Sequence, residues 1–281
     1  MGKVGLVLEG GAMRGMFTAG VIDVLIQNDV WLDGVVGVSA GACFGCNYQS
    51  GQVGRALRYN LTYCRDPRYC SVRSLVRTGD LFGADFCYRE LPFELDPFDM
   101  AAFEASKVPF WVVCTSVSSG EAVYHCCERA DEDMLMWVRA SSSMPIVSRP
   151  VEREGDQMLD GGIADPIPLR FFEGQGYERN VMVLTQTRDY VKRQSAAWPL
   201  MRLALRRQPA IARAMERRPE VYNEAHSYTF AQKREGAAFV LCPREPLPAH
   251  RVEHDPRRLM ATYFEGQRVA EQELERLRAW L

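Results

Sequence analysis

Short apolar runs alternate along the chain with longer segments in which apolar residues recur every three or four positions. Residues 3–9 form an apolar and β-branched run that stops at Gly10, and residues 16–27 follow with helical spacing. A second apolar run over residues 31–38 leads directly into a helix of small residues. Repeated strand, loop and helix units predict an α/β protein with a largely parallel sheet.

Later segments extend this pattern. Further buried strands are predicted at residues 109–117, 180–187 and 238–242, with a helix at residues 131–143. An amphipathic stripe predicts a C-terminal helix at about residues 256–281. We therefore expect a single α/β domain over residues 1–281, a three-layer sandwich around a mostly parallel or mixed central sheet.

Composition and charge exclude several classes of protein. The chain has 281 residues, 47% of them hydrophobic and 25% charged, which is typical of a globular protein. Its 34 basic and 36 acidic residues nearly cancel, so general nucleic-acid binding is not expected. The nine cysteines form no compact disulfide framework, and the first apolar run is too short for a signal peptide. These features predict a cytoplasmic protein.

Two segments depart from this balance of charge. Residues 192–218 contain eight basic residues and one acidic residue, and two prolines, Pro199 and Pro209, are expected to divide them into two short helical pieces. Residues 80–104 contain seven acidic residues, one arginine and five phenylalanines. A solvated surface is the ordinary explanation of such runs. For the basic segment, the alternative is peripheral contact with an anionic membrane surface.

The most informative motif is Gly37-Val38-Ser39-Ala40-Gly41, placed where a strand turns into a helix. A serine on such a sharp turn is exposed for attack, and its flanking backbone passes too close to its neighbours for a Cβ at either glycine. The start of the following helix favours negative charge beside the serine. The motif therefore predicts a nucleophilic Ser39.

A glycine loop between the first strand and the first helix is the second motif. It reads Glu9-Gly10-Gly11-Ala12-Met13-Arg14-Gly15, and consecutive glycines let main-chain N–H groups converge on an oxyanion or a phosphate. The alternative is a dinucleotide-binding loop with Gly10, Ala12 and Gly15 in the G-x-G-x-x-G positions. Ala12 argues against it, because that position needs glycine to admit a pyrophosphate.

The third motif is Asp160-Gly161-Gly162, followed by residues 163–168. A carboxylate on a glycine turn after a short strand can be aimed as a general base. Taken alone, the same three residues are most often only a turn.

In this order the three motifs, with Ala140-Ser141-Ser142-Ser143-Met144-Pro145 between the last two, resemble the patatin-like phospholipase family. The resemblance covers most of the chain. It implies a patatin-like fold and hydrolysis of lipid acyl esters, of the phospholipase A or lysophospholipase type, with no metal or organic cofactor. It also implies roles for particular residues: Ser39 as nucleophile at an elbow flanked by Gly37 and Gly41; Asp160 as the only base, on a turn made by Gly161 and Gly162; and an oxyanion-hole loop of Gly10, Gly11, Ala12, Arg14 and Gly15.

The chain departs from the family at Ala12, where many members have a third glycine. Only the N–H group is needed there, so we expect the alanine to be tolerated with a negative φ. Two other functions remain open. One is an α/β-hydrolase triad in which His250 or His254 completes the pair of Ser39 and Asp160. The other is a lipid-binding regulatory module without turnover.

A metal site is the last alternative. Cys43 and Cys46 have C-x-x-C spacing, and residues 125–127 read His-Cys-Cys. No second ligand pair completes a four-ligand site, so we expect these cysteines to fill space in the core.

Overall fold

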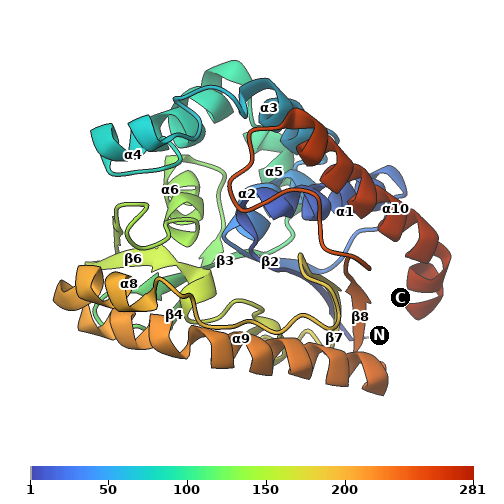
Figure 1. Ribbon diagram of the computed structural model, residues 1–281. Coiled ribbons are helices and arrows are strands. Elements are labelled where there is room, and N and C mark those ends of the chain that lie inside the picture. Colours follow the sequence, from blue (N-terminus) through green and yellow to red (C-terminus); the bar gives the residue numbers. More distant parts are fainter. Residues whose placement is uncertain (1) are drawn as a thin grey trace.

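An eight-stranded mixed sheet forms the centre of the molecule (Figure 1). The computed structural model describes residues 2–281. The strand order is β5-β6-β3-β2-β1-β7-β8, with β4 also paired to β3. The strands are β1 (Val4–Leu8), β2 (Gly34–Val38), β3 (Phe110–Ser116), β4 (Ala122–Cys127), β5 (Val151–Arg153), β6 (Asp156–Asp160), β7 (Arg179–Val183) and β8 (Ala238–Leu241).

Strand direction divides the sheet into two parts. The central strands β3, β2, β1, β7 and β8 run parallel, whereas β4 and β6 pair antiparallel with β3, and β5 pairs antiparallel with β6. All five of the strands predicted from apolar runs lie in the parallel part. Of the antiparallel strands, only the short strand before Asp160, which is β6, was expected. β4 and β5 escaped prediction because β5 has three residues and β4 is only half-buried, so neither forms a continuous apolar run.

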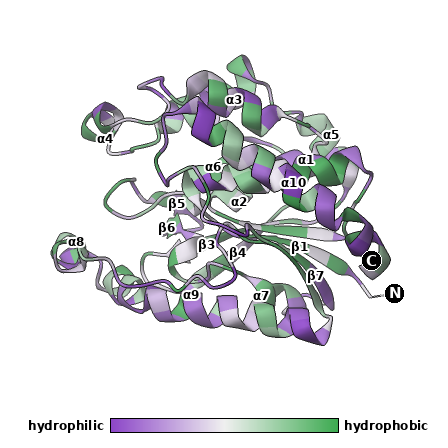
Figure 2. Ribbon diagram, turned by 45° about the vertical axis from the view of Figure 1, so that its right-hand side comes forward, coloured by the Kyte–Doolittle hydropathy of each residue, from purple (hydrophilic) through white to green (hydrophobic). Residues whose placement is uncertain are grey.

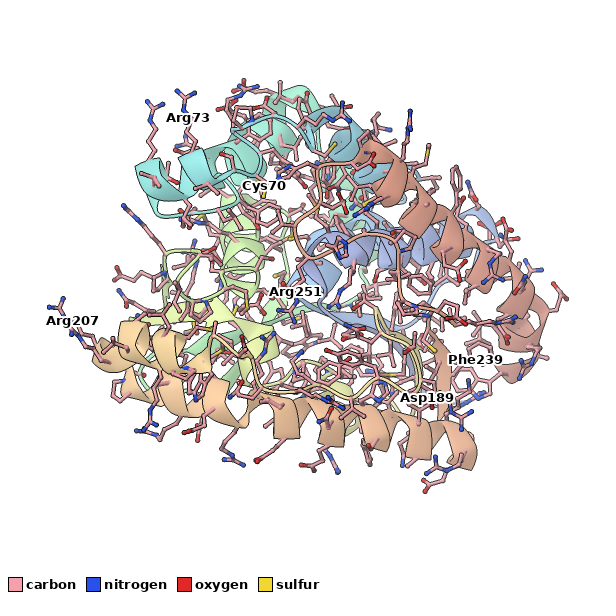
Figure 3. The ribbon with its side chains drawn as sticks, viewed as in Figure 1. Cys70, Arg73, Asp189, Arg207, Phe239 and Arg251 are labelled. Carbon is pink, nitrogen blue, oxygen red and sulfur yellow. The ribbon has the colours of Figure 1, made fainter. Side chains whose placement is uncertain are left out.

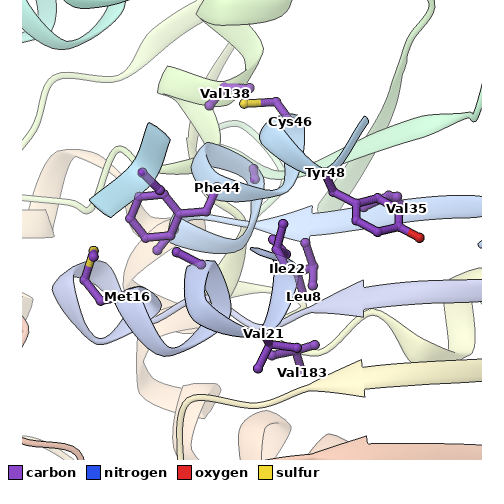
Figure 4. Packing of buried hydrophobic residues seen from close by; sticks show 14 of the residues in the cluster. Leu8, Met16, Val21, Ile22, Val35, Phe44, Cys46, Tyr48, Val138 and Val183 are labelled. Carbon is purple, nitrogen blue, oxygen red and sulfur yellow. The ribbon is translucent and has the colours of Figure 1, made fainter. Parts of the chain in front are cut away.

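Helices cover both faces of the sheet and create three layers. Alternate residues of the strands point to opposite faces: Leu8 and Val183 pack with α1 (Met16–Gln27), whereas Val7 and Met182 pack with Phe172 of α7 (Leu169–Gly174) on the other face. Figure 4 shows Leu8 and Val183 beside Val21 and Ile22 of α1. This arrangement confirms the expected three-layer α/β class.

The remaining helices can be followed in Figures 1 and 2. The face of α1 also carries α2 (Ala40–Gln49) and α10 (Pro256–Trp280), and α9 (Pro209–Glu235) covers the opposite face. The others are α3 (Arg55–Tyr63), α4 (Val72–Thr78), α5 (Met100–Ser106), α6 (Glu132–Ser141) and α8 (Trp198–Ala204), with a π-helical segment η2 (Phe86–Leu95) and short 3-10 turns η1 (Ala12–Gly15), η3 (Gly161–Ile163) and η4 (Leu205–Arg207).

The C-terminal helix α10 packs tightly on α1. A Cβ at Gly20 would lie 2.1 Å from the carbonyl oxygen of Tyr263, and a Cβ at Gly266 would lie 2.1 Å from that of Phe17. The two helices can approach so closely only because glycine stands at both crossings. Across residues 2–281, the helices are all too short or too polar to traverse a lipid bilayer.

The basic segment forms two helices that begin at its two prolines, but the second helix is not short. Pro199 lies in the first turn of α8, and Pro209 begins α9, which runs for 27 residues and continues through Pro219. The buried residues Ile211, Met215 and Tyr222 lie on both sides of this proline. Packing of this apolar face against the protein outweighs the loss of one helical hydrogen bond at Pro219, so the helix is not interrupted.

Candidate active site

The Gly37 to Gly41 motif forms a strained turn between β2 and α2. Ser39 has φ 54° and ψ −119°, a conformation that is uncommon for a residue with a side chain. A Cβ at Gly37 would lie 2.6 Å from the nitrogen of Ala42, and a Cβ at Gly41 would lie 2.3 Å from the carbonyl oxygen of Leu8. Both glycines are therefore required by close backbone contacts, as the sequence predicts.

A buried serine from α6 anchors this turn. The main-chain N–H of Ser39 donates to Oγ of Ser141 at 2.8 Å, and that hydroxyl donates to the carbonyl oxygen of Val113 at 2.6 Å. Ser141 is fully buried. It thereby links the elbow to β3. In the sequence, Ser141 belongs to the motif of residues 140–145, which by itself indicates no contact with the elbow.

Asp160 ends β6, beside β3, and is 3% exposed. Its Oδ1 accepts a hydrogen bond from the N–H of Gly162 at 2.8 Å, and its own N–H donates to the carbonyl of Ser143 at 2.9 Å. Gly161 must be glycine because a Cβ would lie 2.2 Å from the carbonyl oxygen of Val113. Burial raises the pKa of the Asp160 carboxyl, and the Arg218 charge and the Ser39 hydroxyl act in the opposite direction.

The glycine loop follows β1 and faces the same region. Among the described residues, none accepts a hydrogen bond from the N–H groups of Gly10, Gly11 or Ala12. Ala12 has φ 49°, so the negative φ expected for it is wrong. The chain passes at this residue from an extended loop into the 3-10 turn η1, and a left-handed residue makes that bend. Glycine would adopt this conformation at lower cost than alanine.

Arg14 and Gly15 support the loop. Nε of Arg14 donates to the carbonyl of Gly11 at 3.4 Å. Burial lowers the pKa of Arg14, and the carboxylate of Glu9 partly offsets this effect. A Cβ at Gly15 would lie 2.8 Å from the Cβ of Ala40, so glycine lets η1 pack on the helix that follows Ser39.

Two cavities meet at Ser39, and Ala12 also lines both. The first, called here the apolar cavity, has an empty volume of about 890 Å³, part of it open to solvent. Its walls are mainly aromatic, aliphatic and thiol side chains from α2, α3, η2 and α6. Six of them are Phe44, Tyr59, Phe82, Tyr88, Leu91 and Val138. The phenylalanine-rich segment 80–104 thus supplies part of this wall.

The second, called here the polar cavity, contains the catalytic candidates. Asp160, Gly10, Gly11 and Arg14 line it together with Ser39. The cavity also contains four charged residues that were not predicted as site residues: Glu9, Lys192, Arg218 and Arg251. Lys192 and Arg218 lie within the basic segment, whose excess of positive charge is visible in the sequence. Arg251 lies on a connector with no distinguishing pattern.

No histidine of residues 2–281 lines either cavity. His250 and His254 are exposed, and Nδ1 of His254 lies 2.6 Å from the carbonyl oxygen of Cys64. His226 is buried between Tyr222 and Phe230 on α9. The geometry therefore favours a pair of Ser39 and Asp160 over a histidine triad.

The cysteines pack as ordinary core residues. Cys43 lies 3.1 Å from the Ser142 hydroxyl, and burial raises the thiol pKa of Cys43 and of Cys46, the latter to about 12. Within residues 2–281, no three or more histidine, cysteine or acidic side chains gather as a metal site would require.

Two family models match parts of this chain. The family model of the patatin-like phospholipases matches residues 6–172, and a model described as a domain of unknown function (DUF6363) matches residues 208–281. The solved structure of VipD from Legionella pneumophila aligns over 97% of this chain and 67% of its own, with 13% identity and a TM-score of 0.43.

Curated relatives align with about two thirds of this chain. The uncharacterized protein YjjU of Escherichia coli is 31% identical over 205 residues, 66% of this chain and 52% of the relative. An uncharacterized NTE family protein of Mycobacterium tuberculosis is 27% identical over 185 residues, 64% of this chain and 48% of the relative. Lysophospholipase nte1 of Aspergillus niger is 28% identical over 190 residues, 62% of this chain and 11% of the relative. The chain spans about half the length of these bacterial relatives. Since the first family model covers more than half of the chain, the protein belongs to the patatin-like phospholipase family.

Proposed function

We propose that this chain is a serine acyl-ester hydrolase of the phospholipase A or lysophospholipase type, acting through Ser39 and Asp160. The observation that carries the proposal is the position of Ser39, which lies on a strained elbow where an apolar and a polar cavity meet. An acyl chain fits the first cavity, and the polar part of a lipid fits the second. Family membership and the lysophospholipase name of the fungal relative point to the same chemistry.

In the proposed reaction, Asp160 takes the proton of the Ser39 hydroxyl as its oxygen attacks the ester carbonyl. The free N–H groups of Gly10, Gly11 and Ala12 stabilise the oxyanion. The alcohol leaves with the proton, and water then attacks the acyl-enzyme by the reverse proton path. Burial helps, because an aspartate with a raised pKa is a stronger base than one in water.

The test is hydrolysis of aryl esters of increasing acyl length by the full chain and three variants. Ser39→Ala and Asp160→Asn are expected to lose activity, whereas the double variant His250→Ala/His254→Ala is expected to retain it. Loss in the histidine variant would favour the triad instead. A wild-type protein that binds lipid and cleaves neither esters nor thioesters would be a regulatory module.

We also propose peripheral contact with an anionic membrane through α8. Leu200 and Leu203 are 72% and 60% exposed, beside the arginines of η4. Helix α4 lies on the same side of the molecule (Figure 1), and its Val72 and Val76 are exposed. Arg73 and Arg207 project outward on this side (Figure 3). Apolar residues flanked by arginine are typical of helices that lie on an anionic bilayer.

Vesicle flotation tests this contact. We expect stronger binding to anionic than to neutral vesicles at low salt, and weaker binding by Leu200→Ser/Leu203→Ser. Equal binding to both kinds of vesicle would contradict the proposal.

A further inference from the structure

Four cationic side chains surround the polar cavity. They are Arg14, Lys192, Arg218 and Arg251. Each comes from a different segment: η1, the loop between β7 and α8, helix α9, and the connector between β8 and α10, where Figure 3 shows Arg251 near the middle of the molecule. Among the described residues, no carboxylate forms an ion pair with any of the four.

The two acidic residues of the cavity do not neutralise this charge. Oε1 of Glu9 accepts from the hydroxyl of Tyr222 at 2.8 Å, and Oε2 accepts from the N–H of Thr185 at 2.6 Å. Oδ1 of Asp160 accepts from Gly162. Burial raises the pKa of both carboxyls. With all six groups charged, the cavity holds two positive charges in excess.

Arg14, Lys192 and Arg218 are partly buried, whereas Arg251 lies exposed at the rim of the cavity. Cations held this close together repel each other unless an anion joins them. Nε of Arg218 donates to the carbonyl of Gly162 at 2.7 Å, which fixes the guanidinium beside the cavity. The side chain of Asn223 fixes the main chain of Lys192. Its Oδ1 accepts from the Lys192 N–H at 2.8 Å, and its Nδ2 donates to the Lys192 carbonyl oxygen at 3.0 Å. These bonds use only Nε of Arg218 and the main chain of Lys192, so the other N–H groups of the Arg218 guanidinium remain available to a ligand.

The same walls offer nothing to a quaternary ammonium group. Such a group binds to open aromatic faces or to free carboxylates. The ring of Tyr222 already has Nζ of Lys192 at 4.3 Å from its centroid and Tyr190 packed edge-on at 5.6 Å. The carboxylates of Glu9 and Asp160 are engaged as described. A zwitterionic headgroup would bring its positive charge among the cavity's own cations.

We propose that the polar cavity binds the phosphate of a glycerophospholipid or lysophospholipid with a net negative headgroup, so that the enzyme selects anionic over zwitterionic lipids. This inference rests on the proposed function and deepens it. Arginine pairs with phosphate through two N–H groups at once, which suits Arg218 and Arg251. Both lie in residues 208–281, the part matched by the domain of unknown function, so this part supplies specificity to the catalytic half.

The first experiment compares three substrates with one acyl chain: lysophosphatidylglycerol, lysophosphatidylcholine and a monoacylglycerol. We expect the highest kcat/KM for the anionic lipid. Arg251→Gln and Arg218→Gln should each reduce the ratio of anionic to uncharged kcat/KM by about tenfold or more, since each removes a charged hydrogen bond. For Arg251→Gln the loss should appear mainly in KM. Arg251→Lys should restore part of the ratio.

Arg257→Gln is the matched control, because it removes the same charge from the exposed start of α10. Its ratio should equal that of the wild type. The use of ratios separates headgroup recognition from any effect of Arg218 on Asp160 or on folding. An unchanged ratio in both Arg251→Gln and Arg218→Gln, or equal wild-type rates on all three lipids, would overturn the proposal.

The second experiment measures binding without turnover. Ser39→Ala is titrated calorimetrically with lysophosphatidylglycerol below its micelle concentration, with glycerol phosphate and with inorganic phosphate. We expect the lipid to bind, and Ser39→Ala/Arg251→Gln to lose that affinity. Binding of inorganic phosphate alone would instead indicate a site for free phosphate and would overturn the headgroup assignment. Because no hydrolysis is needed, anion binding by an inactive wild type would refute the proposed function and leave this site standing.

Discussion

The two cavities that meet at Ser39 differ in chemistry and in the part of the chain that builds them. The apolar cavity is made by residues 12–142, mostly from helices between β2 and β3, whereas the polar cavity draws on residues from 9 to 251. One is a continuous region of the core left partly unfilled. The other assembles charges from distant segments of the chain. Under the proposed function, acyl chain and headgroup are recognised separately and can be altered separately.

The largest effect is expected where the two cavities join. Ser39→Ala and Asp160→Asn should each reduce kcat by at least about 10³-fold, and the double variant should be no worse than the single ones, because residues that act as a unit are not additive. Single-turnover assays on an aryl ester give these rates. If the loss of kcat in the double variant equalled the product of the two single losses, Ser39 and Asp160 would act independently.

A larger side chain in the apolar cavity should change the preference for acyl length without changing the catalytic pair. Val138→Phe narrows this cavity from α6, and we expect kcat/KM for a long-chain ester to fall by about tenfold or more relative to a short-chain ester. Val53→Phe is the matched control, since Val53 is 37% exposed and lies outside both cavities. An unchanged chain-length profile in Val138→Phe would show that the acyl chain lies elsewhere.

The polar cavity should respond to pH near neutrality. Burial, with the charges of Arg218, Arg251 and Arg14, lowers the pKa of Lys192 to about 7, and Glu9 acts against this shift. Lys192 is charged below this pKa and loses its charge above it. The preference for lysophosphatidylglycerol over monoacylglycerol should therefore fall by up to about tenfold as pH rises through 7. The phosphodiester does not titrate in this range. Lys192→Arg should abolish this pH dependence.

The smallest effect is expected at Ala12, which belongs to the walls of both cavities. Its left-handed φ of 49° costs roughly 1 kcal/mol in an alanine. Ala12→Gly removes this strain while making the unfolded chain more flexible, so the free energy of unfolding should rise by at most about 1 kcal/mol. Ala261→Gly, at an exposed position in α10, should lower it by about 1 kcal/mol. Denaturant titration of both variants measures these opposite changes in the free energy of unfolding.

Sequence patterns located the parallel strands and the principal helices well. The α1 bounds are those of the predicted segment, and the predicted C-terminal helix ends within one residue of α10. Long periodic segments and glycine turns are local signals. The short second helix predicted within residues 192–218 was wrong, because the charge run that defined the segment ends at Arg218, whereas the buried face of α9 continues past it to Glu235.

By itself, the sequence determined the fold class, the elbow at Ser39 and the glycine turns, because each depends on a few consecutive residues whose backbone choices are limited. Only the tertiary structure decided which distant groups meet there. Ser141 reaches the elbow from α6, and Arg251 reaches the polar cavity from a connector. Their positions depend on how β3, α6 and α9 pack around the sheet, and no local pattern records a contact between segments so far apart in the chain.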